Sequence, residues 1–275
     1  MKINHIFAVY FSPTGNTRLA AATAAHHLAG QLDAPCREID ITLPGAHAAP
    51  LDFQKGDLVV VGAPTYAGKL PNKMLPYYQE QLHGGGALAA AVVTFGNRSF
   101  DNSLAELCAT LEKNAFHTVG AGAFVGTHAF SDKLAPGRPA ADDLQQMRDW
   151  ADAMAKKITA AETEADLAPV QPDGDAAAPY YVPKGVDGQP AKFLKAKPLT
   201  DADKCTGCGL CARKCPMGSI DAADPSQVTG VCIKCQSCVR SCPQGAKYFT
   251  DEAFLSHIAM LEQNFIRRAE NRVFL

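Results

Sequence analysis

The arrangement of the cysteines constrains this 275-residue chain more than any other feature of its sequence. Eight of its ten cysteines lie between residues 205 and 242, in two groups that share the spacing C-x2-C-x2-C-x3-C followed by proline. Each cysteine of the second group lies 27 residues after its counterpart in the first group, and the two prolines are related in the same way. The segment is therefore an internal repeat of one ligand-bearing unit.

The spacing within each group is typical of cysteines that hold a 4Fe–4S cluster. Three thiolates at regular intervals on a tight loop can reach three irons of one cube, and in two-cluster proteins the fourth cysteine ligates the other cluster. The sequence therefore predicts two clusters with crossed ligation. The predicted sets are Cys205, Cys208, Cys211 and Cys242 for the first cluster, and Cys215, Cys232, Cys235 and Cys238 for the second.

Structural zinc is the main alternative interpretation of this segment. Four-cysteine zinc sites are usually built from two C-x2-C pairs, which is a different spacing. A second alternative is a pair of structural clusters without a redox role. Bound clusters with their thiolates are negatively charged, so we expect Lys204, Lys214 and Lys234 to compensate that charge rather than to bind an anion.

The two remaining cysteines, Cys36 and Cys108, have no partner at metal-binding spacing and are expected to be small buried apolar residues. A secreted, disulfide-stabilised domain would distribute its cysteines more evenly, and the first residues lack the apolar core of a signal peptide. These features predict a cytoplasmic protein.

A formal net charge of −2 argues against a nucleic-acid partner, and the lack of a long apolar run argues against a membrane partner.

Residues 1–161 alternate between strand-like and helix-like patterns. The strand-like apolar runs are residues 3–10, 36–40, 57–62, 89–95 and 117–126. Continuous apolar strands that alternate with helices are typical of a parallel sheet covered on both faces. The sequence predicts an α/β fold, a doubly wound sheet of five parallel strands, in which ligands bind at the carboxyl ends of the strands.

The rest of the chain divides into three segments. Residues 162–200 are rich in Ala, Pro, Asp and Gly and are predicted to be a linker, although apolar residues in the second half favour docking on a surface. Residues 201–250 are predicted to form a small α+β domain around the two clusters. Residues 251–275 carry apolar residues at helical spacing and are predicted to be a C-terminal helix that packs against a domain.

The turn after the first strand indicates a second ligand site. Residues 12–17, Ser-Pro-Thr-Gly-Asn-Thr, precede a predicted helix, and hydroxyl and backbone N–H groups at a helix N-terminus can bind a phosphate. A simple capped turn is the alternative.

Two other glycine-containing segments do not support an NAD(P) or ATP site. Residues 62–70 are too long for a P-loop and have Leu70 where Ser or Thr is needed, and residues 120–126 lie within a strand.

Residues 10–17 resemble the FMN-phosphate loop of flavodoxins. Residues 62–68 and 94–100 stand where that family places its two isoalloxazine loops, each directly after a buried strand. The whole chain resembles the bacterial family that fuses a flavodoxin-like domain to a two-cluster ferredoxin domain. This resemblance implies an FMN phosphate on Ser12, Thr14, Gly15, Asn16 and Thr17, and ring contacts from Pro64, Thr65, Tyr66, Gly68, Phe95, Gly96, Asn97, Arg98 and Phe100, with Tyr66 or Phe100 as the stacking residue.

Iron–sulfur clusters exchange one electron at a time, whereas a flavin exchanges one or two. The combination predicts an electron-transfer protein that passes electrons between two 4Fe–4S clusters and FMN, and that links a low-potential one-electron carrier to an acceptor. Its partner would be a redox protein or a small electron donor or acceptor. The alternatives are an FMN-dependent reductase of a small organic substrate, with His128 or Tyr66 as proton source, and a redox sensor. The direction of electron flow and the oligomeric state are left open.

Overall fold

A computed structural model describes all 275 residues of the chain. Its main sheet contains five parallel strands: β1 (His5–Tyr10), β2 (Cys36–Asp40), β4 (Asp57–Pro64), β6 (Leu88–Phe95) and β7 (His117–Val125). They lie in the order β2-β1-β4-β6-β7, which is the strand order of the flavodoxin-like doubly wound fold. The predicted fold class is therefore confirmed.

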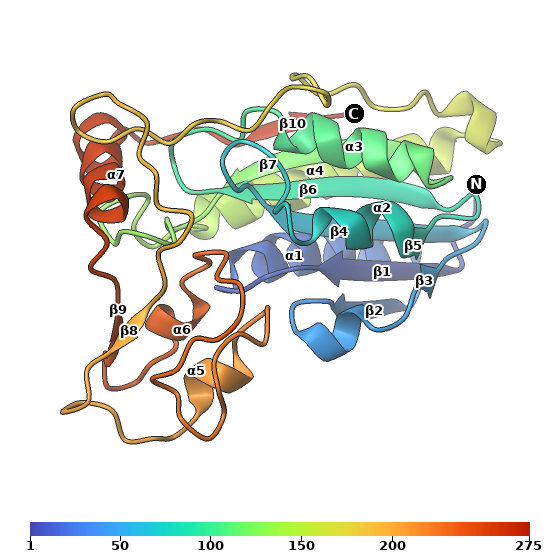
Figure 1. Cartoon of the computed structure of the whole chain (residues 1–275). Coiled ribbons are helices and arrows are strands. Elements are labelled where there is room, and N and C mark those ends of the chain that lie inside the picture. Colours follow the sequence, from blue (N-terminus) through green and yellow to red (C-terminus); the bar gives the residue numbers. More distant parts are fainter.

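Helices cover both faces of this sheet (Figure 1). The helices α1 (Asn16–Leu32) and α4 (Ala141–Ala160) pack on one face, and α2 (Leu75–Glu80) and α3 (Ser103–Lys113) pack on the other. Alanines on the buried side of α1 allow a close approach, since a Cβ at Gly62 of β4 would lie only 3.0 Å from the Ala21 side chain. No helix in the chain has the length and apolarity needed to span a bilayer.

The C-terminal segment differs from its prediction. Only α7 (Glu252–Asn264) is helical, and the chain then returns to the sheet as β10 (Arg272–Phe274), which pairs with β7 in the antiparallel direction. The sheet therefore has six strands rather than the predicted five. The free edge of β7 offers backbone groups that an additional strand can satisfy. This pairing with residues far earlier in the chain outweighs the local helical pattern after Asn264.

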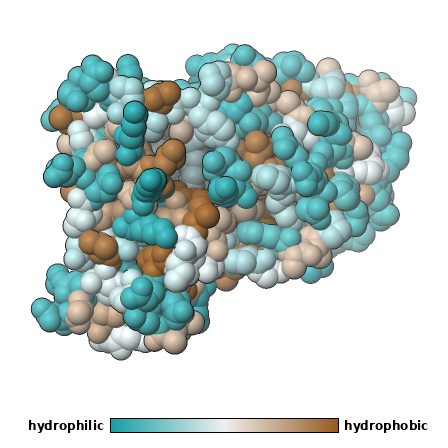
Figure 2. Space-filling model, viewed as in Figure 1, coloured by the Kyte–Doolittle hydropathy of each residue, from teal (hydrophilic) through white to brown (hydrophobic).

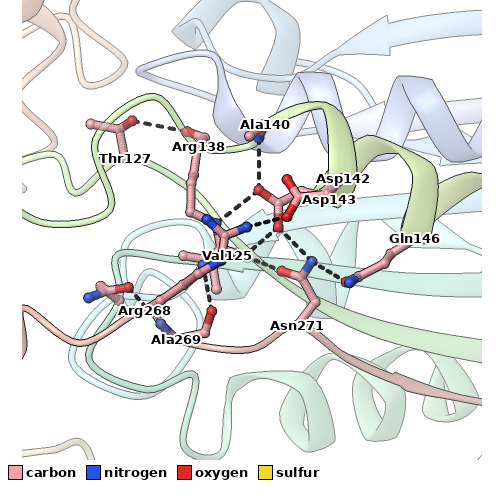
Figure 3. Close-up of polar contacts among 11 residues, drawn as sticks. Val125, Thr127, Arg138, Ala140, Asp142, Asp143, Gln146, Arg268, Ala269 and Asn271 are labelled. Atoms are coloured by element: carbon pink, nitrogen blue, oxygen red, sulfur yellow. Dashed lines mark hydrogen bonds and ion pairs between the residues drawn. The ribbon is translucent and has the colours of Figure 1, made fainter.

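Side chains of the sheet domain hold this C-terminal segment in place (Figure 3). Arg138 and Asp143 form a buried ion pair, and Arg138 also donates to the backbone carbonyl of Ala269. Asn271 accepts a hydrogen bond from the Val125 N–H (2.8 Å) and donates one to Asp143 (2.9 Å). Burial acts to raise the pKa of Asp143, but hydrogen bonds, led by that from Arg138, lower it to about 2. The pair is therefore ionised at neutral pH.

The first part of residues 162–200 lies along the sheet domain, and the rest passes α7 on its way to the cysteine-rich module (Figure 1). The buried Lys69 donates to the Ala178 carbonyl (2.9 Å) and pairs with Glu106 (3.1 Å), and the Tyr180 hydroxyl donates to the Leu70 carbonyl (2.8 Å). These contacts hold the middle of the segment against the sheet domain. Lys69, which stands in the P-loop-like sequence, has a structural role because it holds this segment.

The cysteine-rich module lies beyond the carboxyl ends of the parallel strands (Figure 1). Its regular elements are short: α5 (Leu210–Arg213), α6 (Ser237–Arg240), and a ladder of β8 (Leu199–Thr200) with β9 (Lys247–Tyr248). The sequence repeat is also a backbone repeat, since the residues before α5 and α6 are both left-handed, with φ of 68° and 65°. The other short elements are β3 (Leu51–Asp52), β5 (Leu82–His83) and the 3-10 turns Pro44–His47 and Glu164–Asp166.

Candidate functional site

The eight clustered cysteines line two separate small cavities, which we call the first cage and the second cage. The first cage is lined by Cys205, Cys208, Cys211 and Cys242, and the second cage by Cys215, Cys232, Cys235 and Cys238. The structure thus brings together the two crossed sets that the spacing predicts. Each cage also contains an equivalent N–H···S contact. The Ser219 N–H donates to Cys215 Sγ and the Ala246 N–H donates to Cys242 Sγ, both at 3.3 Å.

The two cages differ in exposure and electrostatics. Cys208 of the first cage is exposed, whereas Cys235, at the equivalent position of the second cage, is buried. Burial raises the pKa of the Cys235 and Cys238 thiols to about 12. Burial acts in the same direction on Cys242 of the first cage, but backbone N–H groups lower the pKa of that thiol. The second cage is therefore the more strongly desolvated of the two.

A third and much larger cavity, of about 520 Å³, lies at the carboxyl ends of the strands, and we call it the sheet-edge cavity. Its wall is formed by the loops after β1, β4, β6 and β7, the linker, the second cysteine motif and α7. Figure 2 shows a recess on this face with apolar side chains around it. The predicted FMN residues that line the cavity are Thr14, Asn16, Thr17, Pro64, Thr65, Tyr66, Gly68, Phe95, Gly96 and Arg98.

The loop after β1 has the geometry of an anion site. Gly15, with φ of 96°, precedes α1, and the backbone N–H groups of Thr14, Asn16 and Thr17 have no acceptor in the protein. The Ser12 hydroxyl accepts a backbone hydrogen bond from the first turn of α1 (2.9 Å). A phosphate would therefore be bound by backbone N–H groups. Ser12 and Gly15 shape the loop and do not line the cavity.

The loop after β4 presents Tyr66 to the cavity. Tyr66 and Lys69 exchange backbone hydrogen bonds (2.8 and 3.2 Å) across a tight turn whose two central residues both have positive φ. Burial, followed by the thiolate charges of Cys235 and Cys232, raises the pKa of Tyr66. The loop therefore holds a neutral phenol beside the second cage.

The loop after β6 contributes Arg98 to the cavity, but not Asn97. The Arg98 guanidinium lies 4.0 Å above the ring of Tyr181, a linker residue, and pairs with Asp101. Asn97 is 1% exposed, and its side-chain amide donates to the Phe265 carbonyl (2.6 Å) after α7. Asn97 therefore holds the C-terminal segment and does not line the cavity in which its flavin contact was expected.

Phe100 also lies outside the cavity. Its ring packs against Phe95, with centroids 5.5 Å apart, and against the core on the α2 and α3 face of the sheet. The side chain is therefore held by the sheet domain itself. Of the two aromatic residues expected to stack on a flavin ring, only Tyr66 borders the cavity.

Part of the cavity wall comes from segments in which no FMN-site residue was predicted. The contributing residues are Tyr180, Tyr181, Pro183, Phe193, Leu194, Lys234, His257 and Leu261. The only signal in the sequence was the group of aromatic residues within an otherwise Ala-, Pro- and Asp-rich stretch. His128, a weak catalytic candidate from the sequence, does line the cavity.

Four phenylalanines from four segments pack together beside the cavity. Phe254 of α7 lies 4.9 Å from Phe130, 5.1 Å from Phe193 and 4.9 Å from Phe249, measured between ring centroids. These partners belong to the loop after β7, the linker and the end of the cysteine-rich module. The group, which we call the phenylalanine cluster, therefore fixes the module against the sheet domain.

A single arginine joins the second cysteine motif to the sheet domain by an ion pair. Arg240, at the end of α6, pairs with Asp132 in the segment after β7. Its Nε donates to the Ala129 carbonyl (3.1 Å) and its Nη2 to the His128 carbonyl (2.9 Å). The position of α6 is thereby tied to the loop that carries His128 into the cavity.

The second cage shares a wall with the sheet-edge cavity. Cys232, Ile233, Lys234 and Cys235 line both spaces, whereas no cysteine of the first cage borders the cavity. The buried Lys234 ammonium holds this wall by donating to the carbonyls of Cys232 (3.0 Å) and Leu194. The second cage is therefore the one adjacent to the predicted flavin site.

Comparisons with known families bear on the cysteine-rich module. Residues 198–221 and residues 229–245 each match the family described as "4Fe-4S binding domain". Together with the two cages of four cysteines, these matches show two 4Fe–4S cluster sites. A search of curated proteins finds no match to the chain.

Among solved structures, similarity covers the flavodoxin-like part of the chain. A flavodoxin from the domain Archaea is 13% identical, with 56% of this chain and 99% of that chain covered and a TM-score of 0.38. The Streptococcus pneumonia TIGR4 flavodoxin is 20% identical (55% and 98% covered, TM-score 0.41), and an apo NADH:FMN oxidoreductase is 17% identical (60% and 94% covered, TM-score 0.40). The fold assignment rests on the strand order itself.

Proposed function

We propose that this chain is an electron-transfer protein that passes electrons between two 4Fe–4S clusters in the cages and FMN in the sheet-edge cavity, and so links a low-potential one-electron carrier to an acceptor. The observation that carries the proposal is the shared wall formed by residues 232–235. Two ligands of the second cluster, Cys232 and Cys235, belong to that wall. No separate layer of protein therefore has to stand between this cluster and a flavin in the cavity.

The sheet-edge cavity suits FMN at both ends of the molecule. The unpaired N–H groups of the loop after β1 suit the phosphate, and the aromatic and aliphatic side chains of the wall suit the ring. No Asp or Glu side chain lines the cavity, so no carboxylate there opposes the negative charge of the phosphate. These features support FMN over a neutral or cationic ligand.

The exposure of the cages supports an order of transfer. The exposed Cys208 brings the first cage to the surface, where an external carrier can approach it, while the second cage lies against the sheet domain. When bound, the clusters supply one-electron chemistry and the flavin one- or two-electron chemistry. The contribution of the chain is to fix their positions through Arg240, Lys234 and the phenylalanine cluster.

Anaerobic flash reduction of the fully loaded protein tests this proposal. A photoreduced low-potential donor injects electrons, and the absorbance of the clusters and of FMN is followed separately. We expect the clusters to be reduced first and FMN afterwards, at a rate that does not change with protein concentration because the transfer is intramolecular. FMN-free protein is the matched control for the cluster signal.

Two outcomes would contradict the proposal. In one, FMN remains oxidised while the clusters are reduced, at potentials where FMN should accept electrons. In the other, the rate of FMN reduction rises in proportion to protein concentration, which would mean that electrons pass between molecules rather than along the chain.

A further inference from the structure

Two histidines from opposite ends of the chain face the sheet-edge cavity. His128 lies in the loop after β7 and His257 lies on α7, and both line the cavity. Each has one ring nitrogen bound to the protein. The Phe130 N–H donates to His128 Nδ1 (3.0 Å), and His257 Nδ1 is 2.8 Å from the Lys184 carbonyl oxygen. Neither Nε2 atom has a partner in the protein.

These hydrogen bonds give the two free nitrogens opposite characters. A ring nitrogen that accepts an N–H bond carries no proton, so the proton of neutral His128 is on Nε2, which is a donor. A ring nitrogen that donates to a carbonyl carries the proton, so Nε2 of neutral His257 is an acceptor. The cavity therefore contains one directed N–H donor and one directed lone pair.

Both rings are neutral at neutral pH. Burial, followed by the neighbouring charges of His257, Arg240 and Arg98, lowers the pKa of His128 to about 4. Burial also lowers the pKa of His257, a residue that is only 6% exposed. The donor and acceptor pattern is therefore stable under physiological conditions, and the His257 lone pair is an unpartnered polar atom on a side chain that is more than nine-tenths buried.

The position of the histidines relates them to the predicted ring loops. The His128 ring lies directly against Gly96 in the loop after β6, where a Cβ would be 2.3 Å from His128 Cδ2. The His257 ring stacks on Phe193 at 5.4 Å between centroids, which fixes its orientation. In the same loop, the side-chain amide of Asn97 is engaged with the C-terminal segment.

A ligand that satisfies both nitrogens must present an acceptor such as a carbonyl oxygen to His128 Nε2–H and an N–H group to His257 Nε2. In FMN this pattern is found on the pyrimidine edge of the ring, where N3–H lies between two carbonyl groups. We propose that His128 and His257 recognise this edge, with His128 Nε2–H donating to a flavin carbonyl oxygen and His257 Nε2 accepting the flavin N3–H. The inference rests on the proposed function, because it requires FMN in the sheet-edge cavity.

The test compares FMN with 3-methyl-FMN, in which a methyl group replaces the N3 hydrogen. Dissociation constants are measured by quenching of flavin fluorescence on protein that holds both clusters but has been freed of flavin. A site built around a buried acceptor discriminates strongly against a ligand that lacks the donor. We expect 3-methyl-FMN to bind at least about tenfold more weakly than FMN.

Two histidine variants assign the contacts. His257→Ala removes the acceptor and makes room for the methyl group, so the preference for FMN should fall to about threefold or less. His128→Phe removes only the carbonyl donor, so it should weaken both flavins by a similar factor, about threefold to tenfold. His83→Ala, on the exposed β5, is the matched control and should leave both constants unchanged. Iron content and circular dichroism verify that each variant is folded, and His257→Phe replaces His257→Ala if the latter is not.

The outcomes separate this inference from the proposed function. Equal affinity for FMN and 3-methyl-FMN, or an undiminished preference for FMN in both His257 variants, would overturn the assignment of the histidines while FMN binding itself stands. Absence of FMN binding to the cluster-loaded protein would overturn the proposed function as well.

Discussion

The two halves of the cysteine repeat carry the same ligands and have different surroundings. Arg213 of the first half and Arg240 of the second stand 27 residues apart, at the ends of α5 and α6. Arg213 donates to the carbonyl of Cys208 within its own motif (3.0 Å), whereas Arg240 reaches the sheet domain and pairs with Asp132. The repeat thus provides the cages, and the arginine of the second half ties its cage to the loop beside the predicted flavin site.

The backbone shows the same difference. Two left-handed positions of the first half, Gly207 and Gly209, correspond to Lys234 and Gln236 in the second half, with φ of 56° and 65°, whereas a third position is glycine in both halves. Non-glycine residues in this conformation cost roughly 1–2 kcal/mol each. Lys234 offsets that cost through its hydrogen bonds to the linker and to Cys232. The strained backbone of Lys234 therefore lies in the wall between the second cage and the sheet-edge cavity.

Removing one ligand from each half gives the largest expected effect. Cys235→Ala and Cys208→Ala should each lower the iron content by about four atoms per chain. In Cys235→Ala the first cluster should still be reduced in the flash experiment while FMN stays oxidised, because the cluster next to the cavity is missing. In Cys208→Ala the entry of electrons should slow, so that the second cluster and FMN are reduced late and together. Reduction of FMN at the parental rate in Cys235→Ala would show that the cages are not ordered as described.

Replacing Arg240, one of the two arginines at equivalent positions of the repeat, is expected to have the next largest effect. Arg240→Gln removes the ion pair and two hydrogen bonds to the loop after β7, so it should slow FMN reduction about tenfold or more while cluster and FMN content are retained. Arg213→Gln, the matched control, should leave the rate unchanged because its partner is local. A result in which both variants are equally slow would contradict the positioning role of Arg240.

Making the second half resemble the first is a smaller perturbation. Lys234→Gly relieves the left-handed strain but removes the contacts with Cys232 and the linker, so FMN should dissociate about threefold to tenfold faster. The reciprocal change Gly207→Lys in the first half should leave FMN release unchanged. Stopped-flow displacement of FMN measures the dissociation rate of FMN from each variant. An unaltered rate in the Lys234→Gly protein would argue against this wall as part of the flavin site.

The smallest expected effect comes from adding strain to the first half. Gly209→Gln places a side chain at φ of 68° without any compensating contact, which should destabilise the chain by about 1 kcal/mol. For a chain of this size the melting temperature should fall by about 2–4 °C, as measured anaerobically by calorimetry. A melting temperature equal to that of the parent protein would show that this position does not require glycine.

The sequence predicted those parts of the structure whose residues lie close together in the chain or follow a regular apolar pattern. The crossed cages follow from cysteine spacing within a single segment, and the parallel sheet follows from apolar runs such as those of β4 and β6. The loop after β1 was also identified, because the groups that form it are consecutive in sequence. In each case the relevant contacts lie within a few residues or obey a general rule of strand order.

Contacts between distant segments were not predictable in this way. Asn97 stands in a predicted flavin loop, but it binds Phe265, and nothing near Asn97 in the sequence indicates that partner. The strand β10 forms because β7 has a free edge, although the residues that precede β10 follow a helical pattern. His257 was overlooked for the same reason, since its role appears only when α7 is placed over the cavity.

Anomalous diffraction at the iron edge, from anaerobic crystals of the FMN-loaded protein, tests the central claim most directly. The account predicts two four-iron clusters, one in each cage, with the flavin ring on the cavity side of Cys232 and Cys235 and closer to the second cluster than to the first. Single metal ions in the cages, or a flavin located away from the wall at residues 232–235, would contradict it.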